Sequence, residues 1–306
     1  MFYLGYKNWI RYGWTQDLNS YHTDYASFVI DFSNYDKTEK YTAIDSALLT
    51  IDKIVEEYPP PYTLMCSGGV DSQSMLYSWL KSGKDFTVVS ARYVSNGIWF
   101  NDYDLNDLNK FAIKHNIDIK YIDINIINFL ENDLTYISKK YDCDSPQICT
   151  HIKMTDSIDR GTILFSGNVT GPDYGNTIDY TLMGMHRFAL SLNESKRVVP
   201  FFFIHTPELV YSFISEHSIK EVKAVEDKFT IYSKNGFDIV KPNRKYTGFE
   251  SLKNYYDQFQ TRVDTRSRLL YASMPSQRVF DLLFGYPLCN KKGAYSGTYI
   301  PICKFA

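Results

Sequence analysis

Residues Cys66 to Ser72 carry the sequence Cys-Ser-Gly-Gly-Val-Asp-Ser, which combines the residue types that bind phosphate groups. Adjacent glycines let the backbone approach an anion closely, and a helix that begins at this point offers unpaired N–H groups and the positive end of its dipole. The two serines add hydroxyl donors. The carboxylate of Asp71 is compatible with bound phosphate when a cation, most simply Mg²⁺, lies between the two. The segment therefore predicts a phosphate-binding loop.

The same residues have one plainer interpretation and exclude one kind of nucleotide site. A Gly-Gly turn followed by an aspartate also describes an ordinary helix start, in which Asp71 caps the helix. The nucleoside-triphosphate loop with the pattern GxxxxGK[ST] is excluded, because the segment contains no lysine and its spacing differs. The agreement of a strand, the loop and a helix in succession favours phosphate binding.

The sequence on both sides of the loop predicts the elements that must position it. Tyr62 to Cys66 is a short apolar run typical of a buried strand. After the loop, the apolar residues from Met75 to Leu80 recur at helical spacing until Gly83 ends the helix. Ahead of the strand, apolar residues spaced by four, three and four predict a helix over residues 41–58, which the three prolines at 59–61 stop.

Strands and helices continue to alternate after Gly83. Residues 86–93, 119–124 and 162–165 have the composition of strands, and residues 105–115 and 148–158 have apolar side chains at helical spacing. This alternation predicts an α/β fold with a doubly wound parallel sheet. Ligands bind beyond the carboxyl ends of the strands in such sheets. The strand at 162–165 ends in a second Ser-Gly pair, Ser166-Gly167, so we expect both Ser-Gly turns at that edge.

The chain divides into three predicted regions. They are a small lead-in at 1–60 with a strand at 27–32 and the helix 41–58, the α/β domain at 61–205, and a mainly helical, substrate-shaping region at 206–306. The pattern in the last region predicts helices at 208–214, 249–260 and 277–283. It also predicts a hairpin formed by residues 228–232 and 238–240.

The composition indicates a globular protein. With 33 basic and 35 acidic residues the net charge is −2, which argues against a nucleic-acid-binding protein held by bulk phosphate attraction. Five cysteines without a CxxC pair argue against a zinc knuckle and a disulfide framework. The longest apolar stretches, such as Val198 to Ile204, are far shorter than the roughly 20 residues that cross a bilayer. We expect a cytoplasmic protein with no membrane partner, and the sequence leaves its oligomeric state open.

The loop resembles the signature of the PP-loop ATP pyrophosphatase superfamily, Ser-Gly-Gly-x-Asp-Ser after the first strand, and matches it at every position from Ser67 to Ser72. The resemblance implies the HUP-like α/β fold of that superfamily, with ATP and Mg²⁺ as cofactors. It also implies the chemistry. Members of the superfamily cleave ATP between its α and β phosphates and form an adenylated substrate, which a nucleophile then attacks.

Further segments resemble the asparagine synthetase and β-lactam synthetase branch of this superfamily. Gly161 to Gly175 resembles its fourth-strand segment, in which an acidic pair follows a Ser-Gly turn. Residues 197–205 resemble its Arg-Val-Pro-Phe-Leu-Asp-His segment, and residues 239–249 resemble its basic Arg-Lys-x-Gly-Phe stretch. Asn168 stands where the acidic residue is expected. About 60 residues precede the first strand, too few for a glutaminase domain, so we do not expect this chain to hydrolyse glutamine.

The resemblance implies roles for individual residues. The groups that would bind pyrophosphate are the backbone N–H groups of Gly68, Gly69 and Val70 and the hydroxyls of Ser67 and Ser72. The residues that would line the rest of the nucleotide are Ser90, Ala91, Arg92, Ser166 and Gly167. The candidates for steadying the α-phosphate are Lys245, Arg244 and Lys241.

The predicted metal ligands are Asp71 and Asp173, which would hold Mg²⁺ between the phosphates. Asp173 has an alternative as a turn-forming aspartate between Pro172 and Gly175. For Asp71 the alternative is the role of a helix cap.

These roles predict an ATP-dependent, AMP-forming ligase that adenylates a carboxylate or an amide carbonyl of a small-molecule acceptor, for attack by an amine or ammonia. Two alternatives stay open. One keeps the fold and changes the acceptor, so that the enzyme thiolates or amidates a nucleobase or tRNA, which the net charge of −2 does not favour. The other is a non-catalytic nucleotide-binding or structural protein that retains the loop.

Overall fold

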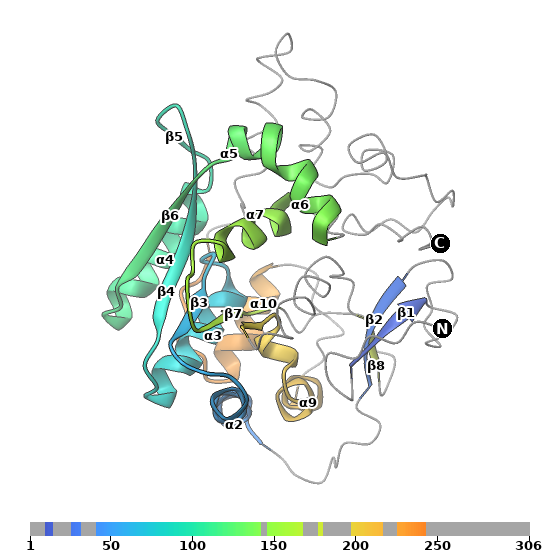
Figure 1. The fold of residues 1–306 in the computed structure, drawn as a ribbon. Coiled ribbons are helices and arrows are strands. Elements are labelled where there is room, and N and C mark those ends of the chain that lie inside the picture. Colours follow the sequence, from blue (N-terminus) through green and yellow to red (C-terminus); the bar gives the residue numbers. More distant parts are fainter. Residues whose placement is uncertain are drawn as a thin grey trace.

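A mostly parallel six-stranded sheet is the larger of the two sheets in the described part of the chain (Figure 1). The computed structural model describes residues 10–14, 26–31, 41–141, 146–167, 177–179, 197–216 and 225–242. The strands of this sheet are β3 (Tyr62–Met65), β4 (Thr87–Ser95), β5 (Ile98–Trp99), β6 (Ile119–Asn125), β7 (Thr162–Phe165) and β9 (Val198–Val199). Their order is β6-β4-β3-β7-β9, with β5 folded back antiparallel on the end of β4.

Parallel pairing joins the strands that carry the two Ser-Gly turns. β3 pairs with β4 on one side, where Met65 lies opposite Val89, and with β7 on the other, where Met65 lies opposite Phe165. The chain runs from β3 outward to β4 and β6 and then returns to β7 and β9, so the strand order reverses between β3 and β7. The predicted α/β class, with a parallel sheet between flanking helices, is confirmed.

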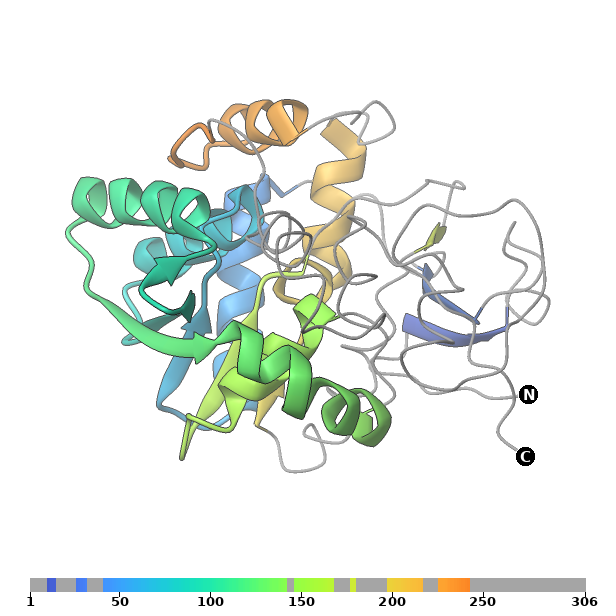
Figure 2. The same ribbon diagram turned by 90° about the horizontal axis from the view of Figure 1, so that it is seen from above.

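Helices cover both faces of this sheet (Figure 2). One face carries α2 (Ala43–Glu57), α3 (Val70–Ser82), α4 (Asp102–His115), α9 (Pro207–Glu216) and α10 (Val225–Lys234). The other carries α5 (Ile126–Asn128), a π-helical turn (Phe129–Asp133), α6 (Leu134–Tyr141) and α7 (Pro146–Thr155). α2 packs on α3 and α9, and α10 packs on α3. Within the described ranges, every helix is too short or too polar to span a bilayer.

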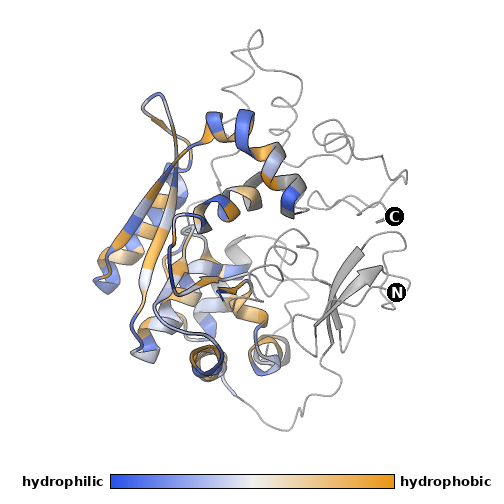
Figure 3. Cartoon of the chain, viewed as in Figure 1, coloured by the Kyte–Doolittle hydropathy of each residue, from blue (hydrophilic) through white to orange (hydrophobic). Residues whose placement is uncertain are grey.

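The helices carry both apolar and polar residues, as the colours of the ribbon show (Figure 3), and their buried apolar residues belong to one hydrophobic core. On α2 the apolar spacing places Ile51 in the core, while Ile44 and Val55 pack partly buried against it. On α3 the fully buried Trp79 packs against the same core, with the Tyr62 ring of β3 at 5.1 Å between centroids. Burial of such a side chain stabilises the fold by about 1.5–3 kcal/mol. These contacts hold the helix that carries the loop firmly against the sheet.

A second, three-stranded antiparallel sheet joins the lead-in to the chain after the second Ser-Gly turn. β1 (Ile10–Trp14) pairs with β2 (Ala26–Asp31), and β2 pairs with β8 (Thr177–Asp179). The strand predicted at 27–32 is present as β2. Two segments far apart in the sequence, with Val29 opposite Asp179, therefore lie in one sheet.

The hairpin predicted for residues 228–232 and 238–240 is wrong. α10 covers residues 225–234, and no strand follows it up to residue 242. The run from Lys228 to Tyr232 alternates polar and apolar residues as a strand does, but these two side chains lie one helical turn apart and reach the same partner on α3. The local pattern of this segment is ambiguous, and tertiary contacts decide that it forms a helix. The helices predicted at 249–260 and 277–283 lie outside the described residues.

Candidate functional site

The two Ser-Gly turns lie side by side at the carboxyl edge of the sheet. Ser67-Gly68 follows β3, Ser166-Gly167 follows β7, and these two strands are neighbours. The strand order reverses between them, and the crevice at such a reversal is where ligands bind in open α/β sheets. The tertiary structure thus brings together the two turns that the sequence singles out.

Gly68 is the point where the first loop passes closest to another element. Its φ of +95° lies in the left-handed region, and a Cβ atom on this residue would stand 2.0 Å from the carbonyl oxygen of Asp104 in α4. No side chain fits in that space, and this backbone conformation is strained for any residue other than glycine. Glycine is therefore required here by the close approach of the loop to α4.

The loop is held in shape by its own serines. The N–H of Gly68 donates to Ser72 Oγ at 3.2 Å, and the N–H of Gly69 donates to Ser67 Oγ at 3.3 Å. The Ser72 hydroxyl in turn donates to the carbonyl oxygen of Gly69 at 2.9 Å. Two of the N–H groups predicted to bind pyrophosphate, those of Gly68 and Gly69, therefore have partners within the loop.

The open donors belong to the first turn of α3. Gly69 precedes the helix without a side-chain cap, and the first helical bond runs from the N–H of Gln73 to the Gly69 carbonyl oxygen. Among the described residues, no acceptor takes the N–H groups of Val70, Asp71 and Ser72. These three donors and the helix dipole favour an anion at this place. The residues present therefore fit a bound phosphate group.

Asp71 is held by two side chains from α10. The Lys228 Nζ lies 3.1 Å from one carboxylate oxygen and 3.4 Å from the other, and the Tyr232 hydroxyl donates to the carboxylate at 2.7 Å. The ion pair is largely shielded from solvent, with 17% of the Lys228 side chain and 23% of the Asp71 side chain exposed. A cation and a carboxylate thus stand together beside the open donors.

Gln73 connects the loop to the chain after α10. Its side-chain amide donates to the carbonyl oxygen of Gly68 at 2.6 Å and accepts from the N–H of Val240 at 2.8 Å. The side chain is fully buried, so removing either partner would leave a polar group unpaired away from water. Gln73 therefore fixes the loop relative to the segment that follows α10.

The second turn is anchored by residues that follow β9. The N–H of Phe203 donates to the carbonyl oxygen of Ser166 at 3.1 Å. Gly167 has a φ of +62°, and a Cβ atom on it would lie 2.9 Å from the Phe201 ring. The chain from 168 to 176 lies outside the described residues, so the role of Asp173 as a metal ligand stays a prediction.

Arg92, predicted to line the nucleotide, is engaged between strands. Its guanidinium donates twice to the carboxylate of Asp123 on β6, at 2.6 and 3.0 Å, and lies over the rings of Trp99 and Tyr121. The hydrogen bond to Asp123 raises the pKa of Arg92. In this arrangement the guanidinium joins β4 to β6 and uses two of its five N–H donors in doing so.

The neighbouring residues of β4 are tied to the start of α4. The side-chain amide of Asn101 donates to the carbonyl oxygen of Ala91 at 2.8 Å, and its oxygen accepts from the N–H of Tyr93 at 2.8 Å. Ser90 is buried, and its hydroxyl has no hydrogen-bond partner among the described residues. Of the three residues predicted on this strand, Ser90 is therefore the one with a free polar group in the described structure.

The residues present could hold a magnesium ion only together with a ligand. Among the described residues, no group of three or more His, Cys, Asp or Glu side chains could hold a metal ion. Magnesium keeps few protein ligands and is completed by phosphate oxygens and water in nucleotide sites. The Asp71 carboxylate, which already attracts the Lys228 ammonium, has the chemistry that such an ion requires.

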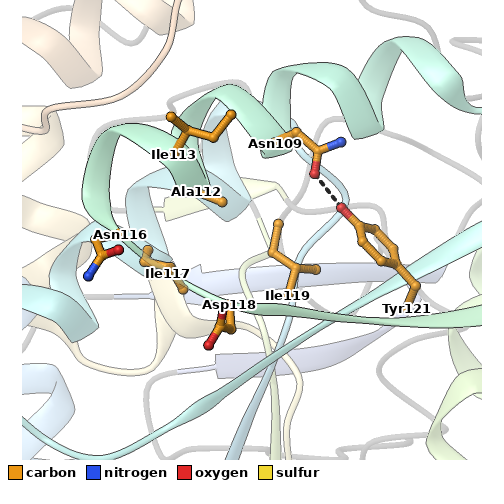
Figure 4. Close-up of a pocket in the computed structure, with 8 residues that line it drawn as sticks. All are labelled: Asn109, Ala112, Ile113, Asn116, Ile117, Asp118, Ile119 and Tyr121. Carbon is orange, nitrogen blue, oxygen red and sulfur yellow. Dashed lines mark hydrogen bonds between the residues drawn. The ribbon is translucent and has the colours of Figure 1, made fainter.

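The described residues also line an open cavity of about 600 Å³ between α4 and β6, the edge strand of the sheet (Figure 4). Its walls are the second half of α4 and the first half of β6, where the Tyr121 hydroxyl donates to Asn109. Ile119 begins β6 and Asp118 directly precedes it, so both lie at the amino edge of the sheet. The cavity is therefore distinct from the crevice between the two loops.

The sequence alone did not predict three residues of the site, which are Lys228, Tyr232 and Gln73. A helical interpretation of residues 225–234 would place Lys228 and Tyr232 on one face, but no local signal pairs that face with Asp71. Of the basic residues predicted to steady the α-phosphate, Lys241 is exposed, and Arg244 and Lys245 lie outside the described residues. In the described structure, Lys228 is the lysine that contacts Asp71 of the loop.

Comparisons with known proteins find no family model that matches the sequence and no matching curated protein. Among solved structures, the U34-tRNA thiolase NcsA from Methanococcus maripaludis is similar over 86% of this chain and 85% of that chain, with 10% identity and a TM-score of 0.32. The NH3-dependent NAD synthetase from Campylobacter jejuni, in complex with the nitrate ion, is similar over 72% of this chain and 95% of that chain, with 13% identity and a TM-score of 0.33. Similarities of this size carry no argument about the activity of this chain.

Proposed function

We propose that this protein is an ATP pyrophosphatase-type ligase. It adenylates a carboxylate or an amide carbonyl of a small-molecule acceptor, releases pyrophosphate, and transfers the activated group to an amine or ammonia. The observation that carries the proposal is the arrangement around Asp71. Open N–H donors, a carboxylate and a shielded lysine stand together at the edge where the strand order reverses.

The charges at this place suit a metal-bound polyphosphate better than a free anion. The N–H groups of Val70, Asp71 and Ser72 would bind phosphate oxygens, and Lys228 adds a positive charge beside them. A bare anion would be repelled by the Asp71 carboxylate. The carboxylate becomes favourable when Mg²⁺ accompanies the phosphates, as it does in ATP.

In the first step of the proposed reaction, an acceptor oxygen attacks the α-phosphorus of ATP and pyrophosphate leaves. Each residue of the site has a role in this step. Bound Mg²⁺ would neutralise charge on the leaving group. The first turn of α3 holds that leaving group with donors that are already oriented, and Lys228 adds charge stabilisation when it exchanges Asp71 for phosphate. Gln73 and the loop serines keep the donors in place, so little reorganisation is needed during the reaction.

A pyrophosphate-release assay tests this function. The protein is incubated with ATP, MgCl2, ammonium chloride or methylamine, and a panel of L-amino acids and simple carboxylic acids. We expect AMP and pyrophosphate in equal amounts, without ADP. Asp71→Asn should lower the rate by roughly a hundredfold or more, because the metal loses its protein ligand. The matched control is Asp118→Asn, which changes an exposed aspartate directly before β6 and should leave the rate unchanged.

Three results would contradict the proposal. ADP and phosphate as products would place the cleavage between the β and γ phosphates. ATP binding without cleavage for every acid would favour a non-catalytic nucleotide-binding protein. Pyrophosphate release that required added tRNA would favour the nucleic-acid acceptor.

A further inference from the structure

We infer that His151 on α7 binds the nucleophile, an amine or ammonia, and accepts its proton when the new C–N bond forms. The inference rests on the proposed function, because it concerns the second half of the proposed reaction. It is carried by the position of α7 over the crevice and by the free nitrogens of the imidazole.

α7 lies above the ends of β3 and β7 in the view of Figure 1. The hydroxyls of Thr150 and Tyr93, the latter near the carboxyl end of β4, lie 2.7 Å apart. The next residue, His151, stacks on Phe165 at the end of β7, with ring centroids 5.9 Å apart and planes inclined by 29°. β3 lies between β4 and β7. Two consecutive residues that contact both neighbours of β3 therefore place this turn of α7 over the end of β3, where the first loop begins.

The His151 side chain is only partly buried, and the stack on Phe165 is its described contact. Neither ring nitrogen has a hydrogen-bond partner among the described residues. Because the side chain is only partly buried, its nitrogens can bond a small molecule or water rather than a neighbouring protein group. The ring nitrogens of His151 thus remain available to a ligand in the crevice.

The protonation state of His151 decides which ligand fits. Burial lowers the pKa of His151 to about 4, so the ring is neutral at pH 7 and offers one N–H donor and one lone pair. A neutral ring gives no charge attraction to a phosphate or a carboxylate, whereas its lone pair suits the N–H of an amine or an ammonium ion. The anionic groups have their own partners on the opposite face of the sheet, on α3 and α10. The nucleotide and the nucleophile would therefore reach the crevice from different sides.

The second half-reaction balances with His151 as the proton acceptor. The nitrogen lone pair attacks the carbonyl carbon of the adenylate and forms the C–N bond. The bond from that carbon to the phosphate oxygen breaks, and AMP leaves with the electron pair. The nitrogen loses one proton to the His151 lone pair, which later passes it to water, so no further reactant is needed. Stacking on Phe165 holds the ring plane during this transfer.

His151→Gln separates the two half-reactions. Exchange of labelled pyrophosphate into ATP, with the acid that gives the fastest pyrophosphate release, reports adenylation alone and should stay within about threefold of the wild-type rate. Amide formation from ammonium chloride should fall by roughly a hundredfold, the usual contribution of a general base. Hydroxylamine is a stronger nucleophile that needs less help from a base, so it should restore most of the product. His115→Gln, which removes an imidazole bonded to the Asp238 carbonyl oxygen, is the matched control.

The outcomes distinguish the two proposals. No exchange by the wild-type protein with any acid would overturn the proposed function. Intact exchange together with unchanged amide formation by His151→Gln would overturn the role of His151 and leave the proposed function standing. Loss of exchange in this variant would place His151 in the adenylation step, which also contradicts the inference.

Nuclear magnetic resonance of the histidine rings tests the binding step without any acid. The chain has six histidines, and the ring signals that vanish in His151→Gln belong to His151. Methylamine, added with MgCl2 and the uncleavable analogue α,β-methylene-ATP, should shift one His151 ring nitrogen in a saturable way. A His151 signal that stays in place while the nucleotide binds would overturn the inference.

Discussion

The Lys228 ammonium lies 3.1 Å from the Asp71 carboxylate, although 157 residues separate the two in the sequence. The pair joins α10 to α3 and is largely shielded from water. Desolvation offsets much of the attraction in such a pair, so it contributes little net stability, while removing one partner leaves the other uncompensated. The pair lies beside the open N–H groups of α3, where the proposed function assigns both side chains to the polyphosphate and its magnesium ion.

Lys228→Ala should lower magnesium-dependent pyrophosphate release by roughly a hundredfold, because it removes the positive charge next to the first turn of α3. Lys228→Arg keeps the charge and should lose less. The rates are measured from AMP and pyrophosphate at saturating ATP. Lys234→Ala removes an exposed lysine at the end of the same helix and should act like the wild type. Equal rates for the two alanine variants would rule out the role assigned to Lys228.

Tyr232→Phe should destabilise the protein by about 1.5 kcal/mol, because it removes one hydrogen bond to a charged group and leaves the ring in place. The buried ring packs edge-on against Phe213 and Phe237, so Tyr232→Ala should cost about 3–5 kcal/mol. Urea unfolding measures both free energies of unfolding. Tyr136→Phe, at an exposed tyrosine, is the control and should have no effect. A Tyr232→Phe variant as stable as the wild type would show that the hydroxyl contributes nothing.

Gly68→Ala should cost about 3 kcal/mol or more and should abolish ATP binding, because the new Cβ atom would meet the Asp104 carbonyl oxygen at 2.0 Å. Gly83→Ala is the matched control. Gly83 also has a positive φ, of +67°, but nothing lies within 4 Å of its Cβ position, so the cost should be only about 1 kcal/mol. Urea unfolding and titration with a fluorescent ATP analogue separate the two effects. Similar losses in both variants would mean that the contact with α4 is unimportant.

The lowered pKa of His151 predicts a stability that depends on pH. The imidazole has a pKa near 6.5 in the unfolded chain, and burial lowers the pKa to about 4 in the folded protein. Between these values the unfolded state binds more protons, so the free energy of unfolding should fall as the pH drops from 6.5 toward 4. Above pH 6.5, the pKa of the unfolded chain, the neutral imidazole no longer lowers the free energy of unfolding. Urea unfolding at several pH values in this window should show a shallower slope for His151→Gln, and identical slopes would contradict the shift.

The elements around the loop follow from local pattern. A short apolar run predicts β3, helical spacing predicts α3, and the intervening Ser-Gly-Gly-x-Asp-Ser sequence predicts an anion site. The alternation of strands and helices predicts a parallel sheet, which places the turn at Ser166 beside the turn at Ser67. The inferences about strands, helix and sheet are confirmed, because backbone periodicity and strand order depend on few residues each. The anion site stays a prediction.

The sequence by itself determined the parallel sheet and the edge at which the two Ser-Gly turns lie side by side. Only the tertiary structure decided which groups of the loop are free. It engages the N–H groups of Gly68 and Gly69 with serine hydroxyls, and it turns a run that suits a strand into α10. It also brings Lys228 to Asp71 and His151 to Phe165. Such contacts join residues from distant elements, and their energies depend on packing in three dimensions, which no local spacing records.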